Sequence, residues 1–459
     1  MLAAMALIGC GGEPPQGWGA PFLITATTGT ATGLRLVWSG GPKALAVWET
    51  EEAGTRRVQA MFLEPEDADS REDASDRRGP ASSGTAQRPS APMTLGTPGP
   101  GVPREPDVAM DALGRAVVVW LEREVGLQHV LAKRYDPANG WASDETMGAE
   151  SNDLAPRVAV HPNGSALVAW MRILGGLLGP TVSRAPIMSR AFQQDQGWGP
   201  ERKLDTSAGS TRSPAVAFDG QGRGMVIWPQ HDAGPTASFP LALWSRDVDL
   251  STGAGTTAWL EDMRIDALMP QLVTLSDGRV LAAWRERNGT TEGRVSTSLF
   301  TPGTGWSVPQ QPTGPAVLVE DVSALSLAPG PDGTSAVMWT EKQAGRNRLG
   351  LNRLSGAQVN TPLVVVNEPD TVPLLPQLVL DSSGQAIWIW VQGTAYASAL
   401  WASDQVANGA TGPAVRLDQH NSAGPASAGL ALGKDGKALA AWLQNTPNGA
   451  RLWGAWRYP

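Results

Sequence analysis

A glycine followed six residues later by a tryptophan recurs along the chain, and this repeat limits the possible fold more than any other feature. Seven copies keep this spacing: Gly114/Trp120, Gly164/Trp170, Gly222/Trp228, Gly278/Trp284, Gly333/Trp339, Gly384/Trp390 and Gly436/Trp442. Gly41/Trp48 is an eighth copy with one additional residue. Steps of 50 to 72 residues separate successive tryptophans. A near-regular period of about fifty residues predicts an array of similar structural units.

Each copy predicts a β-hairpin. A short strand such as residues 156–160 precedes a turn such as Pro162-Asn163-Gly164, in which Gly and Asn supply the backbone conformation of tight turns. The strand after the turn, for example residues 116–120, is apolar at every position. A strand covered on one face only would alternate, so we expect this one to be buried on both faces.

The residues that follow each hairpin predict two further strands. The third strand alternates more, as in residues 294–299, and the fourth often begins with Gly-Trp, as at Gly140-Trp141, Gly197-Trp198 and Gly305-Trp306. Four strands in about fifty residues are typical of a propeller blade. We therefore predict an all-β chain that forms a single β-propeller of about eight four-stranded blades, or seven if the irregular first copy is not one.

The two ends of the chain predict how the ring closes. The last repeat stops after its third strand, at residues 451–458, and Gly17-Trp18 looks like the missing outer strand. An N-terminal strand in the last blade would remove two free sheet edges. The predicted propeller covers residues 17–459. An insertion at about 64–91 mixes charges with Ser, Pro and Gly and is expected to be disordered.

The first residues predict a lipid anchor. Leu7-Ile8-Gly9-Cys10 fits the lipobox of bacterial lipoproteins, with residues 1–10 as the end of a signal peptide and residues 11–16 as a tether. No Lys or Arg precedes the short apolar run, which departs from the lipoprotein pattern and points to a start further upstream. The alternative is a cysteine without a role. Lipidation of Cys10 would place the protein on the bacterial cell envelope, at the outer membrane or cell surface; the chain could also be secreted.

Composition and motifs argue against several classes of function. The net charge of −8 and a pI near 5.2 do not fit a nucleic-acid partner. His129, His161, His231 and His420 lack the spacing of metal ligands, and His161 stands where other turns have Asp. No phosphate-binding, dinucleotide or serine-nucleophile motif is present. We therefore expect no metal and no cofactor.

Residues 106–120, Pro-Asp-Val-Ala-Met-Asp-Ala-Leu-Gly-Arg-Ala-Val-Val-Val-Trp, carry the repeat best. They resemble repeats of secreted bacterial proteins that are loosely described as sialidase-like propellers. The resemblance covers residues 17–459 and implies the fold. It departs from the true Asp-box of sialidases, where the aromatic residue comes three residues after the Gly.

The position two residues after each repeat tryptophan is polar in every copy: Thr50, Glu122, Arg172, Gln230, Glu286, Glu341, Gln392 and Gln444. These residues are expected where the second strand enters the loop to the third, on the propeller face that commonly holds ligands. We take the last seven as candidate ligand-binding residues. The alternative is that a strand end simply meets water. For the repeat tryptophans, core packing is the expected role; Trp18, Trp141, Trp198 and Trp306 are more peripheral and better placed to bind.

Three functions remain open. The first is a non-enzymatic, envelope-anchored binding or assembly scaffold that acts as a monomer and binds an unknown protein or glycan. The second is a glycan-binding lectin. The third is a glycoside hydrolase that uses two of Glu122, Glu286 and Glu341 as its carboxylate pair.

Overall fold

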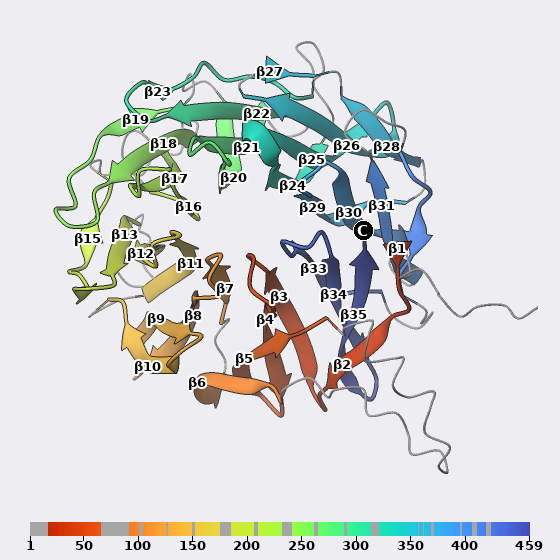
Figure 1. Cartoon of the computed structure of the whole chain (residues 1–459), viewed down its shortest axis with the longest axis horizontal. Coiled ribbons are helices and arrows are strands. Elements are labelled where there is room, and N and C mark those ends of the chain that lie inside the picture. Colours follow the sequence, from red (N-terminus) through yellow and green to blue (C-terminus); the bar gives the residue numbers. More distant parts are fainter. Residues whose placement is uncertain are drawn as a thin grey trace, which may run out of the picture.

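A computed structural model describes residues 17–65, 91–100, 104–124, 127–148, 152–174, 185–205, 210–231, 241–260, 265–288, 292–313, 321–356, 358–360, 362–368, 371–394, 397–405, 411–418 and 424–459. These residues form β-sheets and one short 3-10 helix, η2 (Pro331–Gly333). The chain is an all-β propeller whose sheets surround a common axis (Figure 1). Cys10, the tether at 11–16 and residues 66–90 of the predicted insertion lie outside the described residues.

Four sheets contain four strands each, in sequence order from the axis outward. The first is β3 (Thr30–Val37), β4 (Ala44–Glu52), β5 (Thr55–Leu63) and β6 (Met93–Pro100). The second is β16 (Ala215–Phe218), β17 (Gly224–His231), β18 (Leu241–Val248) and β19 (Thr257–Trp259). The third is β20 (Asp266–Thr274), β21 (Val280–Asn288), β22 (Glu292–Thr301) and β23 (Gly305–Trp306). The fourth is β29 (Leu374–Leu380), β30 (Ala386–Thr394), β31 (Ala397–Gln405) and β32 (Val415–Arg416).

A fifth sheet has two short outer strands in place of one. It consists of β24 (Asp321–Pro329), β25 (Thr334–Gln343), β26 (Arg346–Ser355), β27 (Gln358–Val359) and β28 (Leu363–Glu368).

A nine-stranded sheet contains two repeats. One is β7 (Asp107–Met110), β8 (Ala116–Glu124), β9 (Leu127–Asp136) and β10 (Gly140–Thr146). The other is β11 (Asn152–Val160), β12 (Ala166–Ile173), β13 (Ile187–Gln193), β14 (Gly197–Trp198) and β15 (Arg202–Lys203). A single parallel pair, Asn152 with Gln128, joins the two halves, so each half keeps the antiparallel order of the other repeats.

The last sheet combines the two ends of the chain. It contains β33 (Ser427–Leu432), β34 (Ala438–Thr446) and β35 (Gly449–Tyr458), with β1 (Gly17–Trp18) and β2 (Phe22–Ala26) on its outer side. Gly17 pairs with Tyr458 and Phe22 with Gly454. The pairing of residues 17–24 with 450–458 expected from the sequence is therefore present, and β3 packs against β33 (Figure 1).

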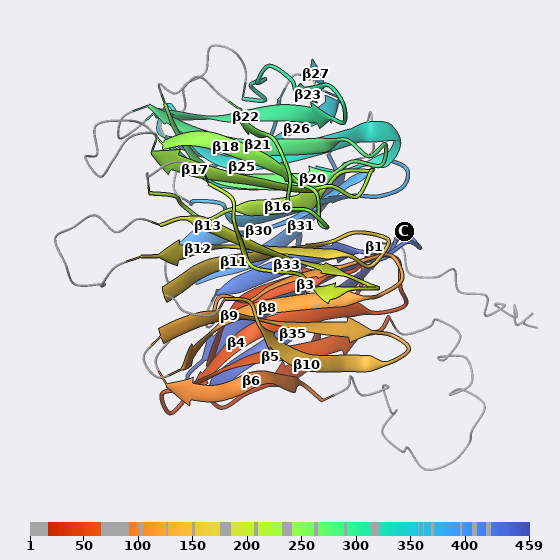
Figure 2. The same cartoon turned by 90° about the vertical axis from the view of Figure 1, so that its left-hand side faces the viewer.

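The strand directions define two faces of the molecule, which lie at opposite ends of the strands seen in Figure 2. The inner strand β7 runs toward the turn at residues 111–114, and the second strand β8 runs back from it. We call the side with these turns the turn face. We call the opposite side, where second strands end and third strands begin, the loop face.

The repeat tryptophans fill the space between neighbouring sheets. All eight are at most 4% exposed: Trp48, Trp120, Trp170, Trp228, Trp284, Trp339, Trp390 and Trp442. Trp170, for example, packs with Val119 and Val130 of the preceding repeat. Their expected role in the core is confirmed, and truncation of such a residue to Ala typically costs about 3–5 kcal/mol.

Side chains from one repeat protect the inner strand edge of the next. The carboxylate of Asp107 accepts a hydrogen bond from the backbone N–H of Val158 at 3.0 Å, and the hydroxyl of Ser326 accepts one from Leu378 N–H at 3.1 Å. An exposed row of unpaired inner-strand amides would otherwise line the axis. These bonds also set the height of each sheet relative to its neighbour.

Candidate functional site

The eight polar positions lie together at the loop-face ends of the second strands, but most of them do not reach solvent. Thr50, Arg172, Gln230, Glu286, Glu341 and Gln444 are buried, and Glu122 and Gln392 are half-buried. The alternative interpretation, that these strand ends simply meet water, does not hold for the six buried residues. They occupy the interfaces between sheets, next to the repeat tryptophans.

Their first role is to accept hydrogen bonds from the tryptophans. The indole Nε1 of Trp228 donates to Gln230 Oε1 at 2.7 Å, and that of Trp390 donates to Gln392 Oε1 at 2.8 Å. The same bond is made in two further repeats: Trp120 to Glu122 at 3.2 Å and Trp339 to Glu341 at 2.5 Å. A buried indole N–H without an acceptor is costly, so the amide or carboxylate two residues along the strand stabilises the packing of these four tryptophans. The indole N–H groups of Trp170, Trp284 and Trp442 are buried without such a partner.

Basic residues on the third strand face several of these positions. Glu286 is paired across the strands with Arg294, and the two form a salt bridge. His129 faces Glu122, and Arg348 faces Glu341. Directly opposite residues of opposite charge stabilise a strand pair. Glu286 and Glu341 are thus held by neighbours within their own sheets, and Glu122 also accepts from Thr97 N–H of the preceding sheet.

Arg172 forms a separate buried ion-pair cluster. Its Nε donates to Asp153 Oδ1 at 3.0 Å, and its Nη1 contacts Glu201. Its guanidinium lies 5.9 Å from the centre of the Trp170 ring. A Cβ on Gly148 would lie 2.1 Å from Arg172 Nη2, so the glycine leaves the space that the arginine fills. The two carboxylates of Asp153 and Glu201 explain why this position carries an arginine.

Each of the three glutamates of the hydrolase hypothesis is engaged by other groups in this structure. Glu122, Glu286 and Glu341 belong to three different repeats. Glu122 accepts from Thr97 N–H and Trp120, Glu286 pairs with Arg294, and Glu341 accepts from Trp339. Burial raises the pKa of Glu341, opposed by the hydrogen bond from Trp339 and the charge of Arg348.

Exposed apolar side chains, rather than the polar ring, distinguish the loop face. Among the described residues, eleven large apolar side chains are exposed, between 38% and 78%. Six of these lie at or next to the loop-face ends of strands: Leu127, Leu174, Met269, Val372, Leu374 and Leu375. Leu113 lies in a turn on the turn face, and the rest lie on or beside outer strands. Sequence reasoning missed this surface.

Two members of this surface sit in an unusual backbone conformation. Met269 (φ 53°) and Leu375 (φ 49°) each precede a proline on an inner strand, and the pairing register shifts there. Glu105 (φ 42°) and Ala155 (φ 50°) occupy the equivalent places in the second and third repeats. A left-handed non-glycine residue is costly and is often found at functional sites. The signal in the sequence is a large apolar residue before the proline of the inner strand, where other repeats have Glu or Ala.

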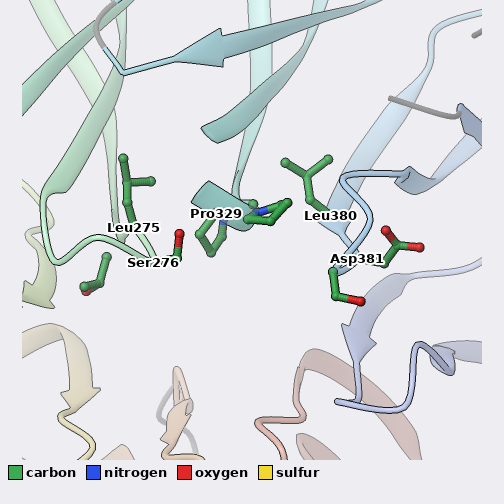
Figure 3. Close-up of a pocket in the computed structure, with 9 residues that line it drawn as sticks. Leu275, Ser276, Pro329, Leu380 and Asp381 are labelled. Atoms are coloured by element: carbon green, nitrogen blue, oxygen red, sulfur yellow. The ribbon is translucent and has the colours of Figure 1, made fainter. Parts of the chain in front are cut away.

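A shallow pocket lies on the turn face. Three neighbouring inner strands and their turns line it: Thr274, Leu275, Ser276, Pro329, Gly330, Pro331, Leu380, Asp381 and Ser382 (Figure 3). Its volume is about 400 Å³. Asp381 Oδ1 already accepts from the backbone N–H groups of Ser383 and Gln385, and Ser276 Oγ accepts from Gly333 N–H. The polar groups of the pocket therefore serve mainly to hold its turns.

The histidines and the outer tryptophans have structural contacts. His161 Nδ1 accepts from Asn163 N–H at 3.3 Å, as Asp111 Oδ1 accepts from Leu113 N–H, so the interpretation of His161 as a turn residue is confirmed. Trp18, Trp141, Trp198 and Trp306 are half-buried; Trp306, for example, donates to Ser245 of the preceding repeat at 2.9 Å. Within the described part of the chain, no group of three His, Cys, Asp or Glu residues could hold a metal ion. No helix among those residues has the length and apolar character of a membrane span.

Comparisons with known proteins return structural likeness alone. No protein-family model and no curated protein matches the sequence. Among solved structures, the chain is similar to Hadza microbial sialidase Hz136 (14% identity, 72% of this chain and 73% of that one, TM-score 0.41). It is also similar to polysaccharide lyase Uly1 (10%, 75% and 88%, 0.46) and to the β-propeller domain of the Trilobed protease from Pyrococcus furiosus (10%, 77% and 92%, 0.43). The function is therefore argued from the side chains of this chain.

Proposed function

We propose that the chain is a non-enzymatic, envelope-anchored β-propeller scaffold that binds a partner protein through its loop face. The observation that carries the proposal is that Leu127, Leu174, Met269, Leu374 and Leu375, with Val372, are exposed on that face in four different repeats. Exposed apolar side chains on one face provide anchors for a partner, because burying them in a complex removes them from water. Each Å² of apolar surface buried in this way contributes roughly 25 cal/mol to association.

The contacts of the candidate glutamates support a binding function over a hydrolytic one. A glycosidase needs two carboxylates that face each other across the scissile bond, about 5–9.5 Å apart. Here Glu122, Glu286 and Glu341 satisfy indole, amide or guanidinium groups. Using any of them as an acid or base would break a contact that holds the fold.

The proposal includes the arrangement of the scaffold. We take the repeats as eight blades, counting the nine-stranded sheet as two, and the ring as closed by β1 and β2. The pairs Gly17–Tyr458 and Phe22–Gly454 support the closure. Cys10 is proposed as the lipid anchor, which would hold the scaffold at the envelope of a bacterial cell.

Site-specific photo-cross-linking in the producing cell tests the proposed function. A photoreactive amino acid replaces Leu174 or Leu375 on the loop face, and Leu113 or Val308 in matched controls elsewhere. We expect adducts with one polypeptide from the loop-face positions and none from the controls. Equal adducts from all four positions, or none, would contradict the proposal; a carbohydrate adduct at the loop face would favour the lectin alternative.

A further inference from the structure

One outer-strand position is equivalent in several repeats and exposes its side chain. In each case the next residue is buried and donates its backbone N–H to the third strand: Met147 to Val130, Leu204 to Ile187, Leu260 to Leu243 and Leu417 to Leu400. The exposed residue just before it is Thr146, Lys203, Trp259 and Arg416, respectively. Leu23, before buried Ile24 in the last sheet, is a further exposed case. Three of these five positions carry a polar side chain, and Trp259 is the aromatic one.

Trp259 is the exposed aromatic residue among the large apolar side chains that the structure describes. It is 52% exposed. It pairs across β18 and β19 with Trp244, and their ring centres are 5.3 Å apart at an angle of 79°. Trp244 in turn packs into the cluster that contains Leu204 and Trp228. The indole of Trp259 is thus supported from within the fold while about half of its surface faces solvent.

The backbone around Trp259 is tied to the preceding repeat. Arg246 lies two residues from Trp244 on β18, and its Nη1 donates to Leu204 O at 2.9 Å. Arg202 on β15 donates through Nη1 to Thr252 O at 2.6 Å, in the turn that leads to β19. Because these contacts lock β15, β18 and β19 together, binding at Trp259 would cost little ordering entropy.

Polar residues occupy the related positions of this strand and of the preceding repeat. Lys203 at the equivalent position of the preceding repeat is exposed and pairs with Asp205 at 3.5 Å. Thr257 lies on the same side of the two-stranded pair as Trp259, opposite Arg246. A flat apolar ring on the same strand face as the Thr257 hydroxyl matches a ligand with one C–H face and a hydroxyl rim.

We propose that Trp259 is a stacking platform for a pyranose ring of a glycan. The C–H face of the sugar would cover the exposed indole, as aromatic side chains with one apolar and one wet side permit. The sugar hydroxyls would bond to Thr257 and to the cationic side chains of β15. The platform is separate from the loop face and does not depend on the protein-binding function.

A glycan array with three matched proteins tests this inference. Trp259→Lys introduces the residue type that Lys203 supplies at the equivalent place, so the fold should tolerate it. Leu23→Lys makes the same change at another exposed outer-strand position. We expect the wild-type chain and Leu23→Lys to bind at least one class of pyranose glycan, and Trp259→Lys to lose about tenfold or more of that affinity.

Retained aromatic character provides the second readout. Trp259→Phe should keep part of the affinity, and glycan binding should shield a tryptophan of the wild-type chain, but not of Trp259→Lys, from iodide quenching. Thermal unfolding of all variants checks that they are folded. A wild-type chain that binds no glycan on the array, or a folded Trp259→Lys that binds like the wild type, would overturn the inference. Neither outcome bears on cross-linking at the loop face.

Discussion

The side-chain amide of Asn445 bonds both backbone groups of Ala31, although 414 residues separate them in the chain. Asn445 Oδ1 accepts from Ala31 N–H at 2.9 Å, and Asn445 Nδ2 donates to Ala31 O at 3.1 Å. Ser427 Oγ adds a bond from Leu34 N–H at 3.0 Å. Side chains of the last repeat thus cover the backbone of the inner strand in the first repeat. Asp107 of the second repeat does the same for the third repeat by accepting the backbone N–H of Val158.

Asn445→Leu should therefore destabilise the whole protein. It removes two hydrogen bonds and leaves the Ala31 amide without its partner, at a cost of about 2–3 kcal/mol. Chemical denaturation gives the free energy of unfolding. Asn139→Leu in an exposed turn is the control and should change it by less than about 0.5 kcal/mol. An equally small effect of Asn445→Leu would mean that contact between the first and last repeats adds nothing to stability.

Gln230→Leu should also destabilise the protein. The substitution preserves size but leaves the Trp228 indole N–H without its acceptor, which costs about 1–3 kcal/mol when buried. The measurement is again equilibrium unfolding, with tryptophan fluorescence as the signal. A variant as stable as the wild type would restore the original hypothesis that these positions are free for a ligand.

Glu341→Gln should give a stability difference that depends on pH. Burial raises the pKa of Glu341 above its ordinary value of 4.5. The folded state then binds the proton more tightly than the unfolded state, so the stability of the wild type is greatest below 4.5 and falls as the pH rises through the raised pKa. Gln retains an acceptor for Trp339, as Gln230 does for Trp228.

Unfolding experiments at pH 4 and pH 7 measure this difference. We expect the free energy of unfolding of Glu341→Gln, relative to that of the wild type, to be larger at pH 7 than at pH 4. A constant difference, or a relative loss at pH 7, would show that Glu341 is not held in an unfavourable charged state.

The fold was largely predictable from the sequence, because burial on both faces leaves a local pattern. An apolar run that ends in Trp120 or Trp170 fixes the second strand and its register. The pairing of Gly17 with Tyr458 was also predictable, because one repeat lacks an outer strand and the N-terminus has one to spare. The second strand and the closing strand could both be predicted because each depends only on the residue pattern that recurs within a repeat.

The candidate site was less predictable, because its properties depend on neighbouring sheets. A polar residue after an apolar strand looks the same whether it meets water or, like Gln230, an indole N–H. Met269 and Leu375 look like core residues of an inner strand, yet bulges before Pro270 and Pro376 expose them. Trp259 was not predicted, because the residue type at its position varies from repeat to repeat and no recurring pattern marks it.

The proposed lipidation of Cys10 predicts how the protein partitions. Expressed with a complete signal sequence, the wild-type chain should enter the detergent phase, and Cys10→Ser should remain in the aqueous phase, because the substitution removes the proposed site of acylation. Mass spectrometry of the N-terminal peptide provides an independent check. If both proteins stay in the aqueous phase, Cys10 is not an anchor.

The central claim is that the loop face binds a partner protein through its exposed apolar residues. The most direct test replaces these residues with charged ones and measures how much of the cross-linked partner each variant recovers. The loop-face variant combines Leu174→Glu, Met269→Glu and Leu375→Glu; Glu105 shows that Glu is accommodated in the backbone conformation of the last two. The control combines Leu23→Glu, Leu113→Glu and Val415→Glu at other exposed positions. We predict that the amount of partner recovered falls about tenfold or more with the loop-face variant and is unchanged with the control. Full retention by the folded loop-face variant, or equal loss by both, would contradict the claim.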